Sequence, residues 1–144
     1  MDIDDTTPCQ FAHPPTDPGR ASASLPRVPI WESAQVHDGE ARASACLIDL
    51  SSKGVLVRTA LSLEPGDEIV MNVHLSQEIA QLAGIELLRL DLAVIAATGS
   101  EPDEFGKWYY RCRQLASSGT PAHSRVATVI IAAFEYNERL RIAS

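Results

Sequence analysis

Apolar and polar residues alternate along several segments between residues 27 and 116, as they do in strands that cover a core with one face. The clearest segment is 67–76, "DEIVMNVHLS", and residues 87–96, "LLRLDLAVIA", repeat its pattern. The apolar residues that share a face are Ile69, Met71, Val73 and Leu75 in the first segment, and Leu88, Leu90, Leu92 and Val94 in the second. Both segments are predicted to be strands.

Four more segments have a weaker form of the same pattern. They are residues 27–36, 43–50, 55–61 and 107–115, and Pro29 would restrict the first to a sheet edge or a strand start. Polar, turn-rich stretches such as "HDGE", "LEPGDE" and "GSEPDEFGK" separate the strands, while "QEIAQLAGIE" is either a short helix or a loop. Strands at this spacing predict an antiparallel sheet that closes into a small barrel or a sandwich.

The period changes to that of a helix in the last part of the chain. Thr120 is a suitable N-cap, and Pro121 suits the first helical turn. Arg139 and Arg141 lie near the end, where positive charge favours the helix dipole. The predicted apolar stripe, which should lie on the sheet, consists of Val126, Val129, Ile130, Ala133, Phe134 and Leu140.

The first 26 residues have a different composition from the rest. They contain five prolines, scattered acidic residues and few large apolar side chains, which is typical of a flexible tail. We therefore expect a tail over residues 1–26 and one folded domain over residues 27–144. Within that domain the sheet should cover about residues 27–116 and the helix about residues 121–141.

The overall charge limits which partners are plausible. A net charge of −7 and a pI near 5.0 argue against general affinity for DNA, RNA or an anionic membrane. An anionic ligand would therefore need a local basic cluster.

No apolar run reaches the roughly 18 residues of a membrane-spanning helix, and "MDIDDTTPCQ" does not resemble a secretory signal. Cys9, Cys46 and Cys112 are odd in number and far apart, which argues against a disulfide framework and for a reduced, cytoplasmic location.

A motif of the form Asp-x-Ser-x-x-Gly follows the second predicted strand. Asp49, Ser51 and Gly54 fill it, "LEPGDEI" comes after it, and "RVPI" lies before it. In this order, followed by a C-terminal helix, the chain resembles a PilZ domain. The resemblance covers nearly all of the expected folded domain. It implies a six-stranded antiparallel barrel with a C-terminal helix, and cyclic di-GMP as a ligand.

In PilZ domains, binding of this ligand requires an Arg-x-x-x-Arg segment before the first strand as well as the Asp-x-Ser-x-x-Gly turn. Arginines bind phosphate through paired donors and also stack on guanine. Arg27 matches the later arginine, but Ala23 occupies the earlier position, and Arg20 lies seven residues from Arg27. One charge-assisted hydrogen bond contributes roughly 1.5–3 kcal/mol. Its loss should weaken binding by about ten- to a hundred-fold.

Each candidate residue also has a purely structural interpretation. Asp49, Ser51 and Gly54 are common turn residues, so they suit a hairpin as well as a ligand site. Arg27 either binds the ligand or is a solvated charge at the start of a strand. Lys53 and Arg58 either add positive potential beside the turn or are ordinary surface charges. Trp108, Tyr109 and Tyr110 are a stacking platform or core residues, and we favour the core for Trp108 and Tyr110.

The sequence contains no pattern typical of a metal site or of catalysis. His37, His74 and His123 with Cys46 lack the spacing of metal ligands. No nucleophile elbow, phosphate loop or paired carboxylates stand out, so an enzyme and a resident cofactor are not expected.

Three hypotheses follow. The first is an adaptor in cyclic di-GMP-linked signalling, for which the family suggests motility, type IV pili or virulence. This adaptor would bind the messenger weakly or not at all and act through protein contacts. The second is a true receptor in which Arg20 and Arg27 close over the ligand beside Asp49, Ser51 and Gly54. The third is a ligand-free oligomerisation module that pairs through its helix. The first ranks above the second because of the missing arginine, and the oligomeric state stays open.

Overall fold

The structure is a computed structural model that describes residues 2–3, 27–117 and 119–143. Arg20, Ala23 and the rest of residues 4–26 lie outside the described residues, as does most of the expected tail. The strands are β1 (Asp2–Ile3), β2 (Val28–His37), β3 (Arg42–Leu50), β4 (Gly54–Thr59), β5 (Glu68–His74), β6 (Leu87–Ala97) and β7 (Trp108–Gln114). The helices are α1 (Gln77–Ala83) and α2 (Pro121–Ala143).

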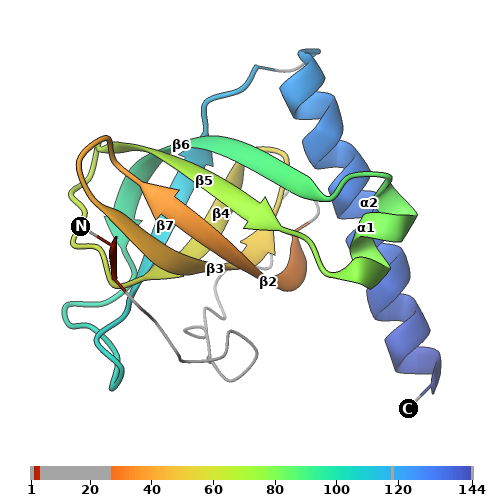
Figure 1. Cartoon of the computed structure of the whole chain (residues 1–144), viewed down its shortest axis with the longest axis horizontal. Coiled ribbons are helices and arrows are strands. Elements are labelled where there is room, and N and C mark those ends of the chain that lie inside the picture. The colour runs from red at the N-terminus through yellow and green to blue at the C-terminus, as the bar shows by residue number, and fades with distance from the viewer. Residues whose placement is uncertain (1, 4–26, 118, 144) are drawn as a thin grey trace.

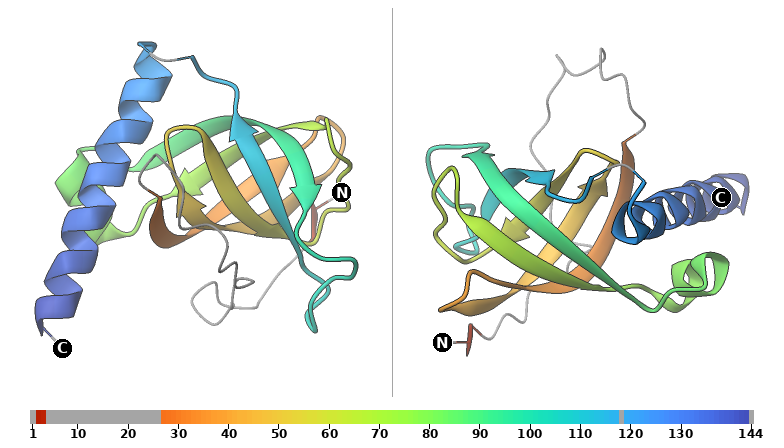
Figure 2. Two further views of the ribbon diagram at one scale, coloured as in Figure 1. Left: turned by 180° about the vertical axis from the view of Figure 1, so that it is seen from behind. Right: turned by 90° about the horizontal axis from the view of Figure 1, so that it is seen from above.

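Strands β2 to β7 form a closed antiparallel barrel, as the ribbon views show (Figures 1 and 2). The strand order is β1-β3-β2-β5-β6-β7-β4, and an additional pairing between β3 and β4 closes the ring. Strand β1 is added outside the ring and pairs in parallel with the start of β3. The predicted six-stranded antiparallel barrel with a C-terminal helix is therefore confirmed.

The barrel interior is filled by the apolar faces that the alternation predicted. Five of these side chains are at most 1% exposed: Met71, Val73, Leu88, Leu90 and Leu92. On β7, Tyr110 points into the same core, where its hydroxyl donates to Leu61 O at 2.8 Å and accepts from Leu63 N at 2.9 Å. Trp108 packs beside it, with ring centroids 6.4 Å apart. The core interpretation of these two aromatic residues is correct.

Helix α2 lies along one side of the barrel beside α1 (Figure 1). Its cap is the predicted one, since Thr120 Oγ1 accepts from His123 N at 3.2 Å. Val126, Val129, Ile130 and Ala133 are buried as predicted.

Two residues of the predicted stripe on α2 are not buried. Phe134 is 45% exposed and Leu140 is 52% exposed. The prediction is wrong for Leu140 because the helix extends beyond the barrel surface that it covers. Phe134 comes before the last barrel contact, and it is exposed because it lies at the edge of the buried helix face, on the side away from the buried Ala132. Asn137 Nδ2 still bonds to Pro29 O at 2.9 Å, but Leu140 and Ile142 lie further along and face solvent.

The outer face of the barrel carries a second, smaller apolar cluster. Cys46, Ile48 and Leu56 are buried there, and Trp31 and Tyr109 pack against them. The cluster forms because β3 has a bulge between Leu47 and Asp49, which interrupts the simple alternation of that strand. Leu47 and Leu50 both reach the inner core, while Cys46 and Ile48 face outward.

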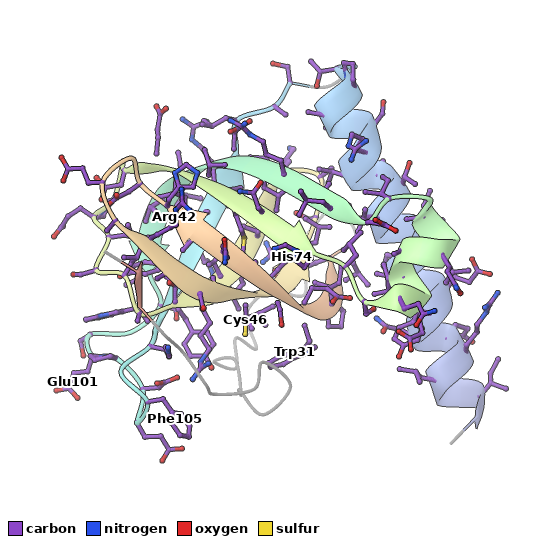
Figure 3. The ribbon with its side chains drawn as sticks, viewed as in Figure 1. Trp31, Arg42, Cys46, His74, Glu101 and Phe105 are labelled. Atoms are coloured by element: carbon purple, nitrogen blue, oxygen red, sulfur yellow. The ribbon has the colours of Figure 1, made fainter. Side chains whose placement is uncertain are left out.

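The cysteines require a correction. The sequence argued against a disulfide framework, but Cys46 takes part in a disulfide whose partner lies outside the described residues. The number and spacing of the cysteines cannot reveal that β3 presents Cys46 on the outer face of the barrel (Figure 3). Cys112 is a free, buried thiol, and burial raises its pKa to about 12.

Within the described residues, no helix is long and apolar enough to cross a membrane.

Candidate functional site

The Asp-x-Ser-x-x-Gly motif forms the tight turn between β3 and β4, and Ser51 shapes it. The Ser51 hydroxyl donates to Gly54 O at 3.1 Å and accepts from Gly54 N at 3.0 Å and Lys53 N at 3.4 Å. A hydroxyl has one donor and two acceptor positions, so all three are used. Ser51 N also donates to Gly54 O at 2.9 Å. Ser51 is 4% exposed and already satisfied within its own turn.

The last residue of β7 fixes the turn from outside. Gln114 N donates to Lys53 O at 2.7 Å, and Gln114 Nε2 donates to Ser51 O at 2.8 Å. These bonds require β4 and β7 to approach closely at Gly54. A Cβ atom at Gly54 would lie 2.8 Å from Cys112 O, which is closer than real Cβ contacts. Gly54 is therefore required for strand packing, whatever else it does.

Arg27 and Asp49 form an ion pair at the edge of this turn. Arg27 Nη1 donates to Asp49 Oδ1 at 3.1 Å, and the two side chains are 28% and 17% exposed. Arg27 immediately precedes β2, and Asp49 lies opposite Pro29 in the β2–β3 register. The pair thus joins the entrance of the barrel to the motif. An arginine has five N–H donors, so the guanidinium keeps further donors for a ligand.

The outer surface beside the motif contains several arginines from β4 and β7. Cross-strand register places Asp49, Leu56 and Arg111 in one row. The next row towards the turn pairs Gly54 with Arg113. On β7, Cys112 is buried between these two arginines, so Arg111 and Arg113 point outward. Arg113 is exposed, and Arg111 is half-buried.

Arg58 occupies the opposite end of this surface and is almost completely buried. Its Nε donates to Asp103 Oδ2 at 3.0 Å, and its guanidinium lies 5.8 Å from the Phe105 ring and 6.0 Å from the Tyr109 ring. Its Nη2 is buried and has no hydrogen-bond partner among the described residues. Figure 3 shows Phe105 on the loop that projects beyond the barrel between β6 and β7.

The carboxylate that holds Arg58 is itself well supported. Asp103 Oδ1 accepts from Phe105 N at 2.9 Å and Lys107 N at 3.0 Å. Burial acts to raise the pKa of Asp103, but these hydrogen bonds and the Arg58 charge outweigh it, so the pKa is lowered. The ionised form is therefore favoured, and Asp103 fixes the loop against the barrel.

Comparison with known proteins identifies the fold family. The model of the PilZ domain matches residues 23–105. The chain belongs to the PilZ domain family. No curated protein matches the chain.

Three solved structures resemble the chain in fold. The PilZ domain of YcgR from Escherichia coli, with c-di-GMP, superposes with a TM-score of 0.62 at 13% identity and covers 85% of this chain and 98% of that chain. The Bacillus subtilis inhibitor of motility MotI/DgrA gives a TM-score of 0.59 at 11% identity, covering 82% of this chain and 52% of that one. The K. pneumonia MrkH–c-di-GMP complex gives 0.58 at 12% identity, covering 81% and 54%. The chain thus spans about half the length of MotI and MrkH.

The PilZ fold brings together four of the five residues proposed from the sequence. Arg27, Asp49, Ser51 and Gly54 lie around one turn, whereas Arg20 lies outside the described residues. Lys53 is exposed beside the turn, but Arg58 is a buried charge rather than a surface one.

Sequence reasoning missed two residues of β7 that lie beside the motif turn. Gln114 holds the turn, and Arg113 lies opposite Gly54. Both positions depend on the pairing of β4 with β7, which are far apart in the sequence. The outward position of Arg113 could have been read from the alternation of β7, but its neighbour across the sheet could not.

Proposed function

We propose that this PilZ domain works in bacterial cyclic di-GMP-linked signalling as an adaptor that binds the messenger weakly or not at all. Its output would be contact with another protein, and motility, type IV pili and virulence are the processes that the family suggests. The proposal includes a cytoplasmic location and no catalytic step. The adaptor role rests on the site, while family membership and the c-di-GMP complexes of YcgR and MrkH support the link to the messenger.

The proposal rests on how the residues of the motif are already used within the fold. Ser51 has no hydrogen-bonding capacity left in its side chain, and Gly54 is required for strand packing. Arg27 already pairs with Asp49, and position 23 holds alanine. Retention of the turn is thus explained by the fold, and the first arginine of the usual pair is missing. Loss of that contact weakens binding by about ten- to a hundred-fold.

Calorimetry of the full chain with cyclic di-GMP tests this proposal. We expect a dissociation constant well above 10 µM at moderate salt, because one charge-assisted contact fewer is available. A low-micromolar dissociation constant would contradict the weak-binding adaptor. It would favour the second candidate, a receptor in which Arg20 and Arg27 act with the Asp49–Ser51–Gly54 turn. The Arg27–Asp49 pair, which places a guanidinium at the turn, is the observation that keeps this candidate open.

A chain that begins at residue 27 separates the two candidates further. The receptor needs Arg20, so truncation should abolish its binding, whereas the adaptor's weak affinity should change little. Equal affinity of the truncated and full chains would contradict the receptor with a closing tail.

A further inference from the structure

Arg113 lies directly across the β4–β7 pair from Gly54. Because Gly54 has no side chain, no side chain of β4 stands between the turn and Arg113. Asp49, with Arg27 attached, lies on β3, and adjacent strands are about 4.8 Å apart. The two arginines therefore approach this surface from opposite sides, with the backbone of β4 between them.

The backbone beside Arg113 is held firmly to the turn. Its neighbour Gln114 bonds to both Lys53 O and Ser51 O, so β7 and the turn keep a fixed relation. The Arg113 side chain itself is exposed and makes no hydrogen bond or ion pair with any residue in the described part of the chain. By contrast, the exposed Arg89 and Arg139 pair with Asp91 and Glu135. Arg113 is thus a free cation on a rigid support.

We propose that Arg113 is a second phosphate-binding residue of this PilZ domain and supplies part of the contact that is lost because position 23 holds alanine. A cyclic dinucleotide carries two phosphates, so its binding gains most from two separate cations. Arg27 would contact one phosphate and Arg113 the other. The inference rests on the proposed link to cyclic di-GMP. It attributes the affinity for cyclic di-GMP that is left without an arginine at position 23 partly to Arg113 on β7.

Local charge supports this assignment. The chain carries −7 overall, so an anion needs a concentrated positive region to be attracted at all. Arg27, Lys53, Arg111 and Arg113 supply that region around one turn, with Asp49 as the acidic residue of the motif among them. Because an arginine fork matches the phosphate oxygens with two parallel donors, Arg113 fits this role better than the nearby Lys53.

The test is a titration of the full chain with cyclic di-GMP, followed by NMR so that millimolar affinities are measurable. Arg113→Ala should bind about ten- to a hundred-fold more weakly than the unchanged protein, and Arg113→Lys should fall between the two. Arg89→Ala is the matched control, since it removes an exposed arginine from neighbouring β6, and its affinity should not change. Arg113 is exposed, so unchanged circular dichroism and amide spectra will show that the fold is intact.

The outcomes for this inference and for the proposed function are separate. An equal affinity of Arg113→Ala and the unchanged protein would overturn the role of Arg113, however tight that affinity is. No binding by the unchanged protein at millimolar ligand would also overturn it, although the adaptor would stand. A low-micromolar affinity that falls with Arg113→Ala would support Arg113 and contradict weak binding.

Discussion

Gly54 gives the sharpest test of whether the motif is retained for the fold. In Gly54→Ala the added Cβ would lie 2.8 Å from Cys112 O and 3.9 Å from the Cys112 carbonyl carbon. Both atoms belong to the backbone of β7, so no side-chain rotation relieves the contact. Strands β4 and β7 must separate by a few tenths of an ångström, at the point where Gln114 bonds to Lys53 and Ser51.

The magnitude follows from two opposing effects. Overpacking of this kind costs typically 1–3 kcal/mol. Replacing glycine with alanine recovers about 0.4–1 kcal/mol by restricting the unfolded chain, and this gain applies because Gly54 does not have a positive φ. We therefore expect a net loss of about 1–2 kcal/mol in the free energy of unfolding. For a domain of this size, that lowers the melting temperature by roughly 3–10 °C.

Urea denaturation followed by circular dichroism measures this loss, with Gly99→Ala as the control. Gly99 also lacks a positive φ, and its added Cβ would meet only Glu101 O at 3.8 Å, which is an ordinary contact. The control should be as stable as the unchanged protein or slightly more so. If Gly54→Ala were as stable as Gly99→Ala, the strand-packing explanation of the motif glycine would be refuted.

The remaining predictions concern affinity, a buried charge and pH. Ala23→Arg should tighten cyclic di-GMP binding by about ten- to a hundred-fold in calorimetry, and an unchanged affinity would contradict the missing-arginine argument. Asp103→Ala leaves Arg58 buried without its carboxylate and should lower the free energy of unfolding by about 3 kcal/mol in urea denaturation. Adding Arg58→Met should recover part of this loss. A double variant no more stable than Asp103→Ala would contradict the view that the unpaired buried charge causes the loss. Burial raises the pKa of Glu32 above 4.5 despite the hydrogen bonds from Ser76, so the folded state holds that proton more tightly than the unfolded chain. Glu32→Gln should therefore be more stable than the unchanged protein at pH 7, with an advantage that shrinks as pH falls towards 4.5; an advantage independent of pH in denaturation curves would exclude this cause.

The sequence predicted those parts of the fold that depend on short-range periodicity. Strands β5 and β6 keep strict alternation because each presents one unbroken face to the core, from Ile69 to Val73 and from Leu88 to Val94. The bulge in β3 depends on how that strand pairs with β4, so alternation alone could not separate Ile48 from Leu50. Similarly, helical spacing identifies Leu140 as part of the apolar stripe but does not show where α2 extends beyond the barrel.

In the candidate site, too, the residues that are close in sequence were predictable and those brought in by long-range strand pairing were not. The motif residues are close in sequence, so their meeting at one turn was predictable, and the order of elements also placed Arg27 near it. The contribution of β7 was not predictable, because the pairings of Gly54 with Arg113 and of Leu56 with Arg111 connect segments that are far apart in the chain. Long-range register of this kind is set by closure of the whole barrel rather than by any local pattern.

The hydrogen bonds within the turn limit where ligand specificity can arise. Ser51 uses its hydroxyl hydrogen and both lone pairs on Gly54 and Lys53, and its carbonyl accepts from Gln114. A ligand that bonded to this hydroxyl would have to break one of these contacts, each contributing about 0.5–1.5 kcal/mol. The guanidinium groups of Arg27 and Arg113 carry no such penalty, since both have unused donors at the surface. Discrimination among anionic ligands should therefore follow the spacing of these two arginines, and a mononucleotide with one phosphate should gain only one of the two contacts.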